Sequence, residues 1–363
     1  MTKRFKIFAI LIAYLFVFSS CSRIDTNTSS DTGLSSLSET TSSSVETTTS
    51  LTTEATTSQT TQAIQAQTTP KAITKPASTT ATQAQPPPKI IIPTVLKTTS
   101  PGTEAYANEL GVIDASNKSQ GYITVKYTGS ATNILALVVK DGKQYQYNLP
   151  SAGVFVTLPL TQGNGDYHVY LGELVGSKLA YALDQNISVS MPNTNSCFLY
   201  PNQKVDFNQN SLVVAKSAEV CAGKNTIYEK IGAIFTYITS NITYDKATAA
   251  AILNGSIKVY TPNPDNTLNR KTGICYDYAS LFAAMARAQG IPTKLIVGYA
   301  SPDNLYHAWN EVYVPSAGWI TVEIQLKGGF NVLDTTFYAS SGNKAATVKN
   351  FSSPGYYRTD FIY

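Results

Sequence analysis

The chain has few of the residues that build common metal and phosphate sites. It contains 2 histidines and 4 cysteines in 363 residues, and the cysteines do not form closely spaced pairs. Histidine and cysteine metal centres depend on such clusters, so the sequence predicts no metal site and no cofactor. It also lacks a glycine-rich loop of the kind that holds phosphates.

Charge and long hydrophobic runs are also scarce. Lys and Arg number 27 against 23 Asp and Glu, a net charge of +4, with no basic run beyond the start of the chain. Nucleic-acid binding depends on clustered basic residues, so we expect no nucleic-acid partner. The apolar run at residues 7–18 is shorter than the roughly 20 residues that a membrane-spanning helix needs.

The N-terminus has the pattern of an export signal, in which Lys3, Arg4 and Lys6 precede that apolar run. It closes with small residues before Cys21, and this ending resembles the lipobox of bacterial lipoproteins. The resemblance implies a lipoprotein signal peptide at residues 1–21 and lipidation of Cys21, so we expect an exported protein anchored by lipid on the outer face of the membrane. An ordinary cleaved signal is the alternative.

Residues 22–104 are dominated by Ser, Thr, Gln and Ala, with prolines near the end and few aromatic residues. Such a segment buries too little apolar surface to offset its ordering entropy. We therefore expect a disordered tether, with a root-mean-square reach of roughly 50 Å as a flexible coil, that extends into the cell wall.

Short β-type runs separated by turn residues fill residues 105–195. Asp141-Gly142 between two of these runs is a strong hairpin signal, and the spacing of the runs is typical of a small β-sandwich. His168 has aromatic neighbours and is expected to have no acid or thiol nearby, so we interpret it as structural. The predicted strands are 121–127, 134–139, 144–147, 154–158, 167–171 and 187–190.

The last region, residues 196–363, begins with helical patterns and continues with strands, which predicts an α+β domain. The third helix ends where Gly290 and Pro292 follow it. The predicted helices are 211–222, 226–240 and 274–289, and the predicted strands, taken as an antiparallel meander, are 294–299, 308–314, 319–326 and 330–333.

Cys275 stands at the predicted start of the third helix, and His307 follows on a strand. The free N–H groups and the positive dipole end of a helix favour a thiolate, and a nearby imidazole would complete a nucleophilic ion pair. This combination predicts a thiol-based acyl-transfer enzyme. A buried cysteine and a strand histidine without mutual contact are the structural alternative.

The residues around this pair resemble the transglutaminase-like superfamily. The resemblance is carried by Gly273-Ile-Cys-Tyr-Asp-Tyr-Ala, Gly290-Ile-Pro-Thr, His307-Ala-Trp-Asn-Glu-Val-Tyr and Gly318-Trp, within about residues 231–337. It implies a papain/transglutaminase-like fold, with Cys275 as nucleophile, His307 as general base and then acid, and an acid that orients the imidazole. Bacterial members are often exported.

Two acids compete for that third role. A simple hairpin turning at Pro315-Ser316 would place Glu323 opposite His307, at the usual family spacing. The family signature of an acid followed by a small residue, threonine and an aromatic is matched by Asp334-Thr335-Thr336-Phe337. We favour Asp334, which needs an irregular stretch within residues 319–329 to reach the ring, and keep Glu323 as the alternative.

Other residues near the motifs have weaker signals. The Cys275 backbone N–H is the expected oxyanion donor, and the second donor cannot be named. Trp309 and Trp319 are interpreted as core residues beside the site, and Tyr299 as a residue that could approach the thiol. Whether Cys197 and Cys221 form a disulfide stays open.

Three functions therefore compete. The first is an extracellular enzyme that attacks amide or peptide bonds of surface proteins or wall peptides and passes the acyl group to water or an amine. The second is a catalytically silent module that binds peptide or glycan at the surface. The third is a structural surface protein whose sandwich is the working part. The fold alone does not choose among them.

Overall fold

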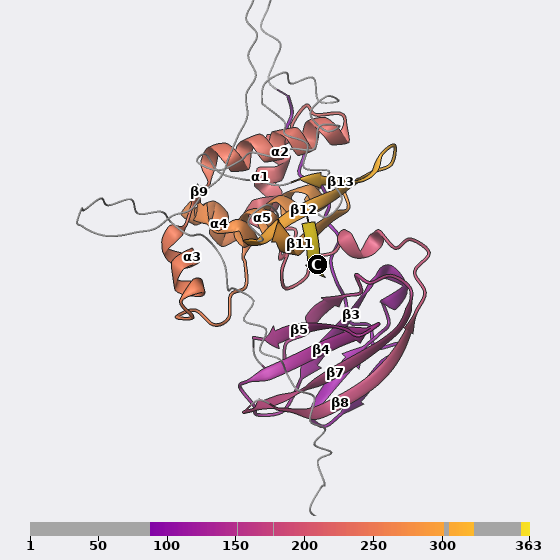
Figure 1. The fold of residues 1–363 in the computed structure, drawn as a ribbon. Coiled ribbons are helices and arrows are strands. Elements are labelled where there is room, and N and C mark those ends of the chain that lie inside the picture. The colour runs from indigo at the N-terminus through magenta and orange to yellow at the C-terminus, as the bar shows by residue number, and fades with distance from the viewer. Residues whose placement is uncertain (1–87, 151, 177, 301–304, 323–356) are drawn as a thin grey trace, which may run out of the picture. The chain divides into compact units, whose positions relative to one another are not determined.

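The computed structural model describes residues 88–150, 152–176, 178–300, 305–322 and 357–363, all within one compact unit. Cys21 and most of the predicted tether lie outside this range. Figure 1 shows a strand-rich region followed by a region of helices and strands, which confirms the expected α+β class with a preceding all-β part. No helix in the described ranges is long and apolar enough to cross a bilayer.

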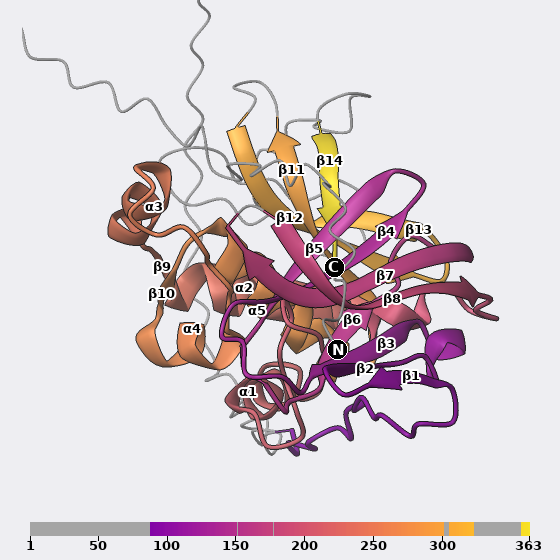
Figure 2. The ribbon, with the colours of Figure 1, turned by 90° about the horizontal axis from the view of Figure 1, so that it is seen from below.

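Two four-stranded antiparallel sheets form the first region (Figure 2). The sheets bury a common core, to which Ile123 and Val125 contribute from one sheet and Val138 and Val169 from the other. This is the predicted β-sandwich. The first sheet contains β1 (Ala105–Asn108), β2 (Gly111–Asp114), β3 (Tyr122–Tyr127) and β6 (Val156–Pro159), and the second β5 (Lys143–Leu149), β4 (Ile134–Lys140), β7 (Gly165–Val175) and β8 (Lys178–Val189), each in spatial order.

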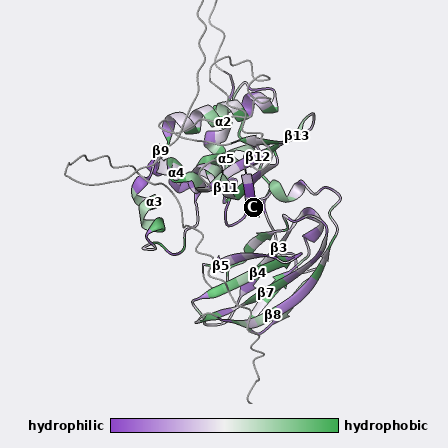
Figure 3. Cartoon of the chain, viewed as in Figure 1, coloured by the Kyte–Doolittle hydropathy of each residue, from purple (hydrophilic) through white to green (hydrophobic). Residues whose placement is uncertain are grey.

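The hairpin predicted at Asp141-Gly142 is present. Both residues have positive φ, 49° and 75°, as a two-residue turn with matched twist requires, and Lys140 pairs with Lys143 across it. The apolar β4 lies at the centre of the second sheet and is coloured as hydrophobic along much of its length in Figure 3. Strands β1 and β2 escaped prediction because each has only four residues and β1 is largely exposed.

His168 differs in one respect from its prediction. Its Nε2 hydrogen-bonds the Asp184 carboxylate, so an acid does lie beside it. The antiparallel β7–β8 pair places Asp184 opposite Tyr170, and this proximity is invisible in the sequence. The ring also stacks on Tyr170, 4.2 Å between centroids, which agrees with a structural role.

Five helices follow the sandwich along the chain and precede the sheet of the C-terminal region. Helix α2 begins at a capping box in which Thr226 and Glu229 satisfy each other's backbone N–H groups. Helix α5 is the central element: every residue from Tyr276 to Ala288 is buried, and it packs on α1, α2, α4 and three strands. The helices are α1 (Leu212–Val220), α2 (Ile227–Asn241), α3 (Lys246–Leu253), α4 (Pro264–Arg270) and α5 (Cys275–Ala288).

The sheet of the C-terminal region is antiparallel, with the strand order β13-β12-β11-β14. The predicted meander is confirmed for three strands, but the last strand returns to pair with β11, which the sequence had not predicted. The predicted strand 330–333 lies outside the described residues. The bounds are β11 (Thr293–Ala300), β12 (Leu305–Val314), β13 (Gly318–Val322) and β14 (Tyr357–Ile362), and a short parallel pair joins β9 (Thr243–Tyr244) to β10 (Thr272–Gly273).

The sandwich packs directly against the end of β14. Tyr145 contacts Phe361 and Tyr363 edge-on, with ring centroids 5.4 and 5.7 Å apart, and its hydroxyl accepts the Ile362 N–H at 3.3 Å. Thr161 donates to the Ile362 carbonyl at 2.8 Å. One hydrophobic cluster consequently contains residues of both regions, while the boundary near residue 195 stays a prediction.

Residues 88–104, assigned from sequence to the disordered tether, have defined contacts instead. Val95 donates its N–H to Gln209 at 3.0 Å beside α1, and Thr99 donates to the Tyr122 hydroxyl at 3.1 Å on β3. The segment therefore joins both regions. Most of its apolar side chains, such as Ile90, Ile91 and Ile92, are exposed, and single hydrogen bonds of this kind leave no periodic signal in the sequence.

Cys197 and Cys221 are both free and buried, so the structure gives no support to a disulfide between them. Burial raises the pKa of the Cys197 thiol to about 12 and that of Cys221 to about 11. Both thiols therefore remain protonated and unreactive near neutral pH.

Lys204 is a buried lysine, 8% exposed, with no carboxylate partner among the described residues. Burial lowers its pKa from 10.5 to about 8. Between pH 8 and 10.5 Lys204 is therefore protonated in the unfolded chain and neutral in the folded one. Over this range the free energy of unfolding of the wild type should rise by about 3 kcal/mol relative to that of Lys204→Met. Urea denaturation of both proteins across this range tests it; parallel curves would contradict it.

Candidate active site

Cys275 is the first residue of α5. The chain reaches it through β10, which pairs with β9 and so fixes Thr272 and Gly273 beside Thr243 and Tyr244. The thiol is free and half-buried, and its backbone N–H, as the first of the helix, has no acceptor within it. The sulfur and this N–H donor therefore lie together at the positive end of α5.

The buried carboxylate of Asp277 stabilises the first turn of α5. It is 1% exposed, and its Oδ2 accepts the Ile274 N–H at 2.9 Å and the Tyr260 hydroxyl at 2.6 Å, while its Oδ1 is buried without a hydrogen bond. Burial raises the pKa of the carboxyl, against the lowering effect of the two hydrogen bonds. A Cβ at Gly273 would lie 2.6 Å from Asp277 Cβ, so the glycine permits this close approach.

Replacing Asp277 separates its capping role from its charge. Asp277→Asn keeps an oxygen acceptor, whereas Asp277→Ala leaves two donors unsatisfied and should lose about 1–3 kcal/mol of unfolding free energy. Since the folded pKa lies above 3.8, wild-type stability should fall as pH rises from 3.8 through that folded value, and the Asn variant should lack this fall. Denaturation of the three proteins measures both effects; equal stability of the Ala and Asn variants would contradict the capping role.

His307 lies on β12, half-buried and opposite Gly298 of β11. Strand β12 packs on α5, where Asn310 donates to the Ala279 carbonyl at 3.0 Å. The neighbouring Tyr306 is close enough to the thiol for a charge on Cys275 to contribute to its raised pKa, after burial, Asp360 and Tyr299. The structure thus brings the start of β12 to the N-terminal end of α5.

Gly298 permits the strand contact next to His307. A Cβ at this position would lie 2.0 Å from the Arg358 carbonyl oxygen of β14, where the β11–β14 register shifts. Gly298→Ala should therefore displace β14 and lower the unfolding free energy by about 2 kcal/mol or more. The control is Gly232→Ala in α2, which has open space around it and should gain about 0.5–1 kcal/mol; equal thermal shifts would refute the steric argument.

The two candidate acids, Asp334 and Glu323, lie outside the described residues. The hairpin argument for Glu323 is nevertheless corrected, because a pair of His307 with Glu323 requires Asn310 to lie opposite Ile320. The structure pairs Asn310 with Val322 and Val314 with Gly318, a register two residues away. The turn at 315–317 is longer than the two-residue turn that the prediction assumed.

The aromatic residues near the motifs are mainly packing residues. Trp309 is 2% exposed and its ring lies 4.7 Å from that of Tyr357. Trp319 is half-buried and lies under the Lys294 ammonium, 4.0 Å from the ring centroid. Tyr299 contacts the Tyr306 ring edge-on, with ring centroids 5.0 Å apart. It therefore touches the residue that is itself near the Cys275 thiol.

Sequence reasoning missed Asp277 and its partner Tyr260. The signal for Asp277 was present, because an acid at the third helical position is a capping pattern. Tyr260 had no signal, since it precedes α4 and approaches only through the fold. Within the described ranges, no group of His, Cys, Asp and Glu side chains could hold a metal ion.

The region that carries Cys275 and His307 is similar in sequence to known proteins. Residues 214–324 match the family model of the transglutaminase-like superfamily. The chain is 29% identical over 117 residues to the protein YebA of Bacillus subtilis, covering 27% of this chain and 15% of YebA. It is 32% identical over 71 residues to a protein-glutamine gamma-glutamyltransferase of Pseudomonas aeruginosa, covering 16% of this chain and 11% of that one.

The chain thus spans a small fraction of the length of these two relatives. Among solved structures, the periplasmic domain of TgpA from Pseudomonas aeruginosa is similar at a TM-score of 0.29 and 15% identity, covering 61% of this chain and 71% of that one. The matched residues 214–324 contain α5 with Cys275 at its start and β12 with His307. Residues 214–324 thus carry the transglutaminase-like match that the motifs around Cys275 and His307 predicted.

Proposed function

We propose that the protein is an extracellular thiol enzyme that cleaves or exchanges amide or peptide bonds of surface proteins or wall peptides. Its catalytic residues would be Cys275, His307 and Asp334, with Glu323 as the alternative acid. The observation that carries the proposal is the position of Cys275, a free and half-buried thiol at the first position of α5, next to the strand that bears His307.

The reaction follows from these groups. The Cys275 thiolate attacks the amide carbonyl carbon, and the Cys275 N–H donates to the oxyanion that forms. The C–N bond then breaks, the imidazolium of His307 gives its proton to the leaving amine, and a thioester remains. Water or a second amine attacks the thioester, gives its proton to the imidazole and releases the acyl product with the thiolate.

The proposed role of His307 depends on the face of β12 from which its side chain projects. The side chains of Tyr306 and His307 leave a regular strand on opposite faces. A charge on Cys275 contributes to the raised pKa of Tyr306. The proposal requires the imidazole to reach the thiol although Tyr306, on the opposite face of β12, is also near it. The acid would hold the ring in that position and stabilise its cation.

The proposed location rests on the N-terminal sequence. A lipid on Cys21 and a long Ser/Thr-rich segment would hold the enzyme at the outer face of the membrane and let it reach wall-attached substrates. Mass spectrometry of the mature N-terminus tests this part independently of catalysis, because a diacylglycerol on Cys21 is expected and an unmodified N-terminus would contradict it.

An electrophilic glutamine or peptide analogue tests the chemistry directly. It should label the native protein at Cys275 alone, because Cys197 and Cys221 are buried and protonated. Labelling should disappear on unfolding at neutral pH and fall strongly in His307→Ala. Labelling that appears only after unfolding, or equally at all three thiols, would overturn the proposal and favour a catalytically silent module.

A further inference from the structure

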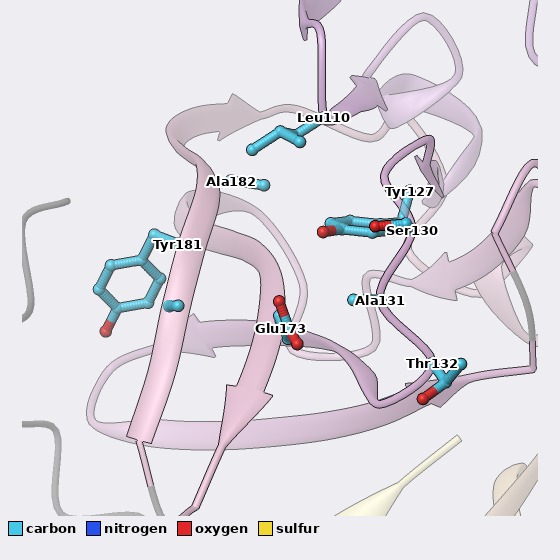
Figure 4. A pocket seen from close by; sticks show the side chains of 9 residues that line it. Leu110, Tyr127, Ser130, Ala131, Thr132, Glu173, Tyr181 and Ala182 are labelled. Carbon is cyan, nitrogen blue, oxygen red and sulfur yellow. The ribbon is translucent and has the colours of Figure 1, made fainter. Parts of the chain in front are cut away.

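The sandwich has a pocket of about 420 Å³ that the proposed catalytic groups do not enter. It is lined by Leu110 next to β2, by Tyr127 and residues 130–132, and by residues of β7 and β8. Figure 4 shows Tyr127 and Glu173 turned toward the same space, with Leu110 above them, while the Tyr181 ring lies on the other side of its strand. The pocket therefore has two polar walls.

Tyr127 is the buried polar group of this pocket. Its side chain is 5% exposed, and its hydroxyl has no hydrogen-bond partner among the described residues. Gly129 packs against the hydroxyl, because a Cβ there would lie 2.6 Å from that oxygen. Burial raises the pKa of Tyr127, and the charge of Glu173 raises it further, so the two groups are close neighbours.

Glu173 is half-buried and, within the described part of the chain, takes part in no hydrogen bond or ion pair. Other acids of the sandwich have partners, as Asp166 does in Ser188 and Glu104 in Lys118. A partly desolvated carboxylate without a partner carries a cost that a bound cation removes. The pocket thus presents an uncompensated negative charge beside a tyrosine hydroxyl.

We propose that this pocket binds the side chain of a lysine in an extended peptide. The ammonium would donate to the Glu173 carboxylate and the Tyr127 hydroxyl oxygen, which are the acceptors that a primary ammonium needs. Its four methylenes would lie against Leu110, Ala131 and Ala182, which are partly buried apolar residues of the lining. This site is separate from Cys275 and does not depend on the proposed catalysis.

Titration of the whole protein with an acetylated and amidated Gly-Lys-Gly peptide tests the proposal, followed by calorimetry or NMR shifts at low salt. The same peptide with an Nε-acetylated lysine keeps its size but loses the charge, and we expect it to bind at least about tenfold more weakly. Added salt should weaken the lysine peptide alone.

Two variants assign the effect to the pocket. Glu173→Gln should weaken lysine-peptide binding about tenfold or more, whereas the matched control Glu219→Gln, on the surface of α1 beside Lys216, should leave it unchanged. Tyr127→Phe should weaken binding a few-fold without lowering the melting temperature, because the hydroxyl has no protein partner. No binding at peptide concentrations on the order of 10 mM, equal binding of the acetylated peptide, or wild-type affinity in Glu173→Gln would each overturn the site.

Discussion

Replacement of Cys275 by alanine should lower amide acyl transfer by about 10⁴-fold or more, because no other described thiol can take its place. Single removal of a catalytic nucleophile typically has an effect of this size, and removal of its base costs nearly as much. The rate would be measured as ammonia release and amine incorporation over a panel of glutamine-containing surface peptides.

His307→Ala gives the matched comparison. Because thiol and imidazole act as one unit, the double variant Cys275→Ala/His307→Ala should be no slower than Cys275→Ala alone. Cys197→Ala and Cys221→Ala serve as controls and should keep activity, since both thiols are buried and free. An unchanged rate in Cys275→Ala, or additive losses in the double variant, would contradict the shared role.

Removal of the Arg287 guanidinium should cause the largest loss of stability. Arg287 is 3% exposed and donates to the main-chain oxygens of Tyr200, Thr293 and Tyr363 at 2.8–3.0 Å. It therefore ties the chain before α1, the start of β11 and the end of β14 to α5. Arg287→Leu would leave three buried carbonyl oxygens without these donors and should lower the unfolding free energy by about 3–5 kcal/mol.

Arg287→Lys is the conservative variant. It keeps the charge but not the planar fork that reaches several oxygens at once, so its loss should be intermediate and measurable even where the Leu variant fails to fold. Lys216→Met, which removes a partly exposed ion pair with Glu219 and a cation–π contact with Tyr237, should change stability by less than about 1 kcal/mol. A thermal midpoint of Arg287→Leu equal to wild type would refute the assigned role.

The periodic elements could be predicted from the sequence. The 3.6-residue pattern located α2 and α5, and the Asp141-Gly142 turn fixed the β4–β5 hairpin, because these signals are local. Strand β14 could not be located in the same way: it pairs with β11, some sixty residues earlier in the chain, and only the fold brings them together. The short strands β1 and β2 failed for lack of length.

The candidate site also contains features with a local sequence signal and features without one. Cys275 was found because its chemistry and its helix start are adjacent in sequence, and the β11–β12 pairing that carries His307 follows from two clear strands. The Tyr260–Asp277 contact and the uncompensated Glu173 beside Tyr127 arise between distant segments. The hairpin register was mispredicted because the length of the turn sets every pair that follows, and the observed register lies two residues away from the predicted one.

The most direct measurement is the rate at which iodoacetamide alkylates Cys275 at about pH 6, in the native protein, in unfolded protein and in His307→Ala. An ion pair of thiolate and imidazolium predicts fast alkylation of native Cys275, at least about tenfold faster than in the unfolded chain, and a loss of this advantage in His307→Ala. A native rate equal to or below that of the unfolded chain would contradict an activated thiol at the start of α5.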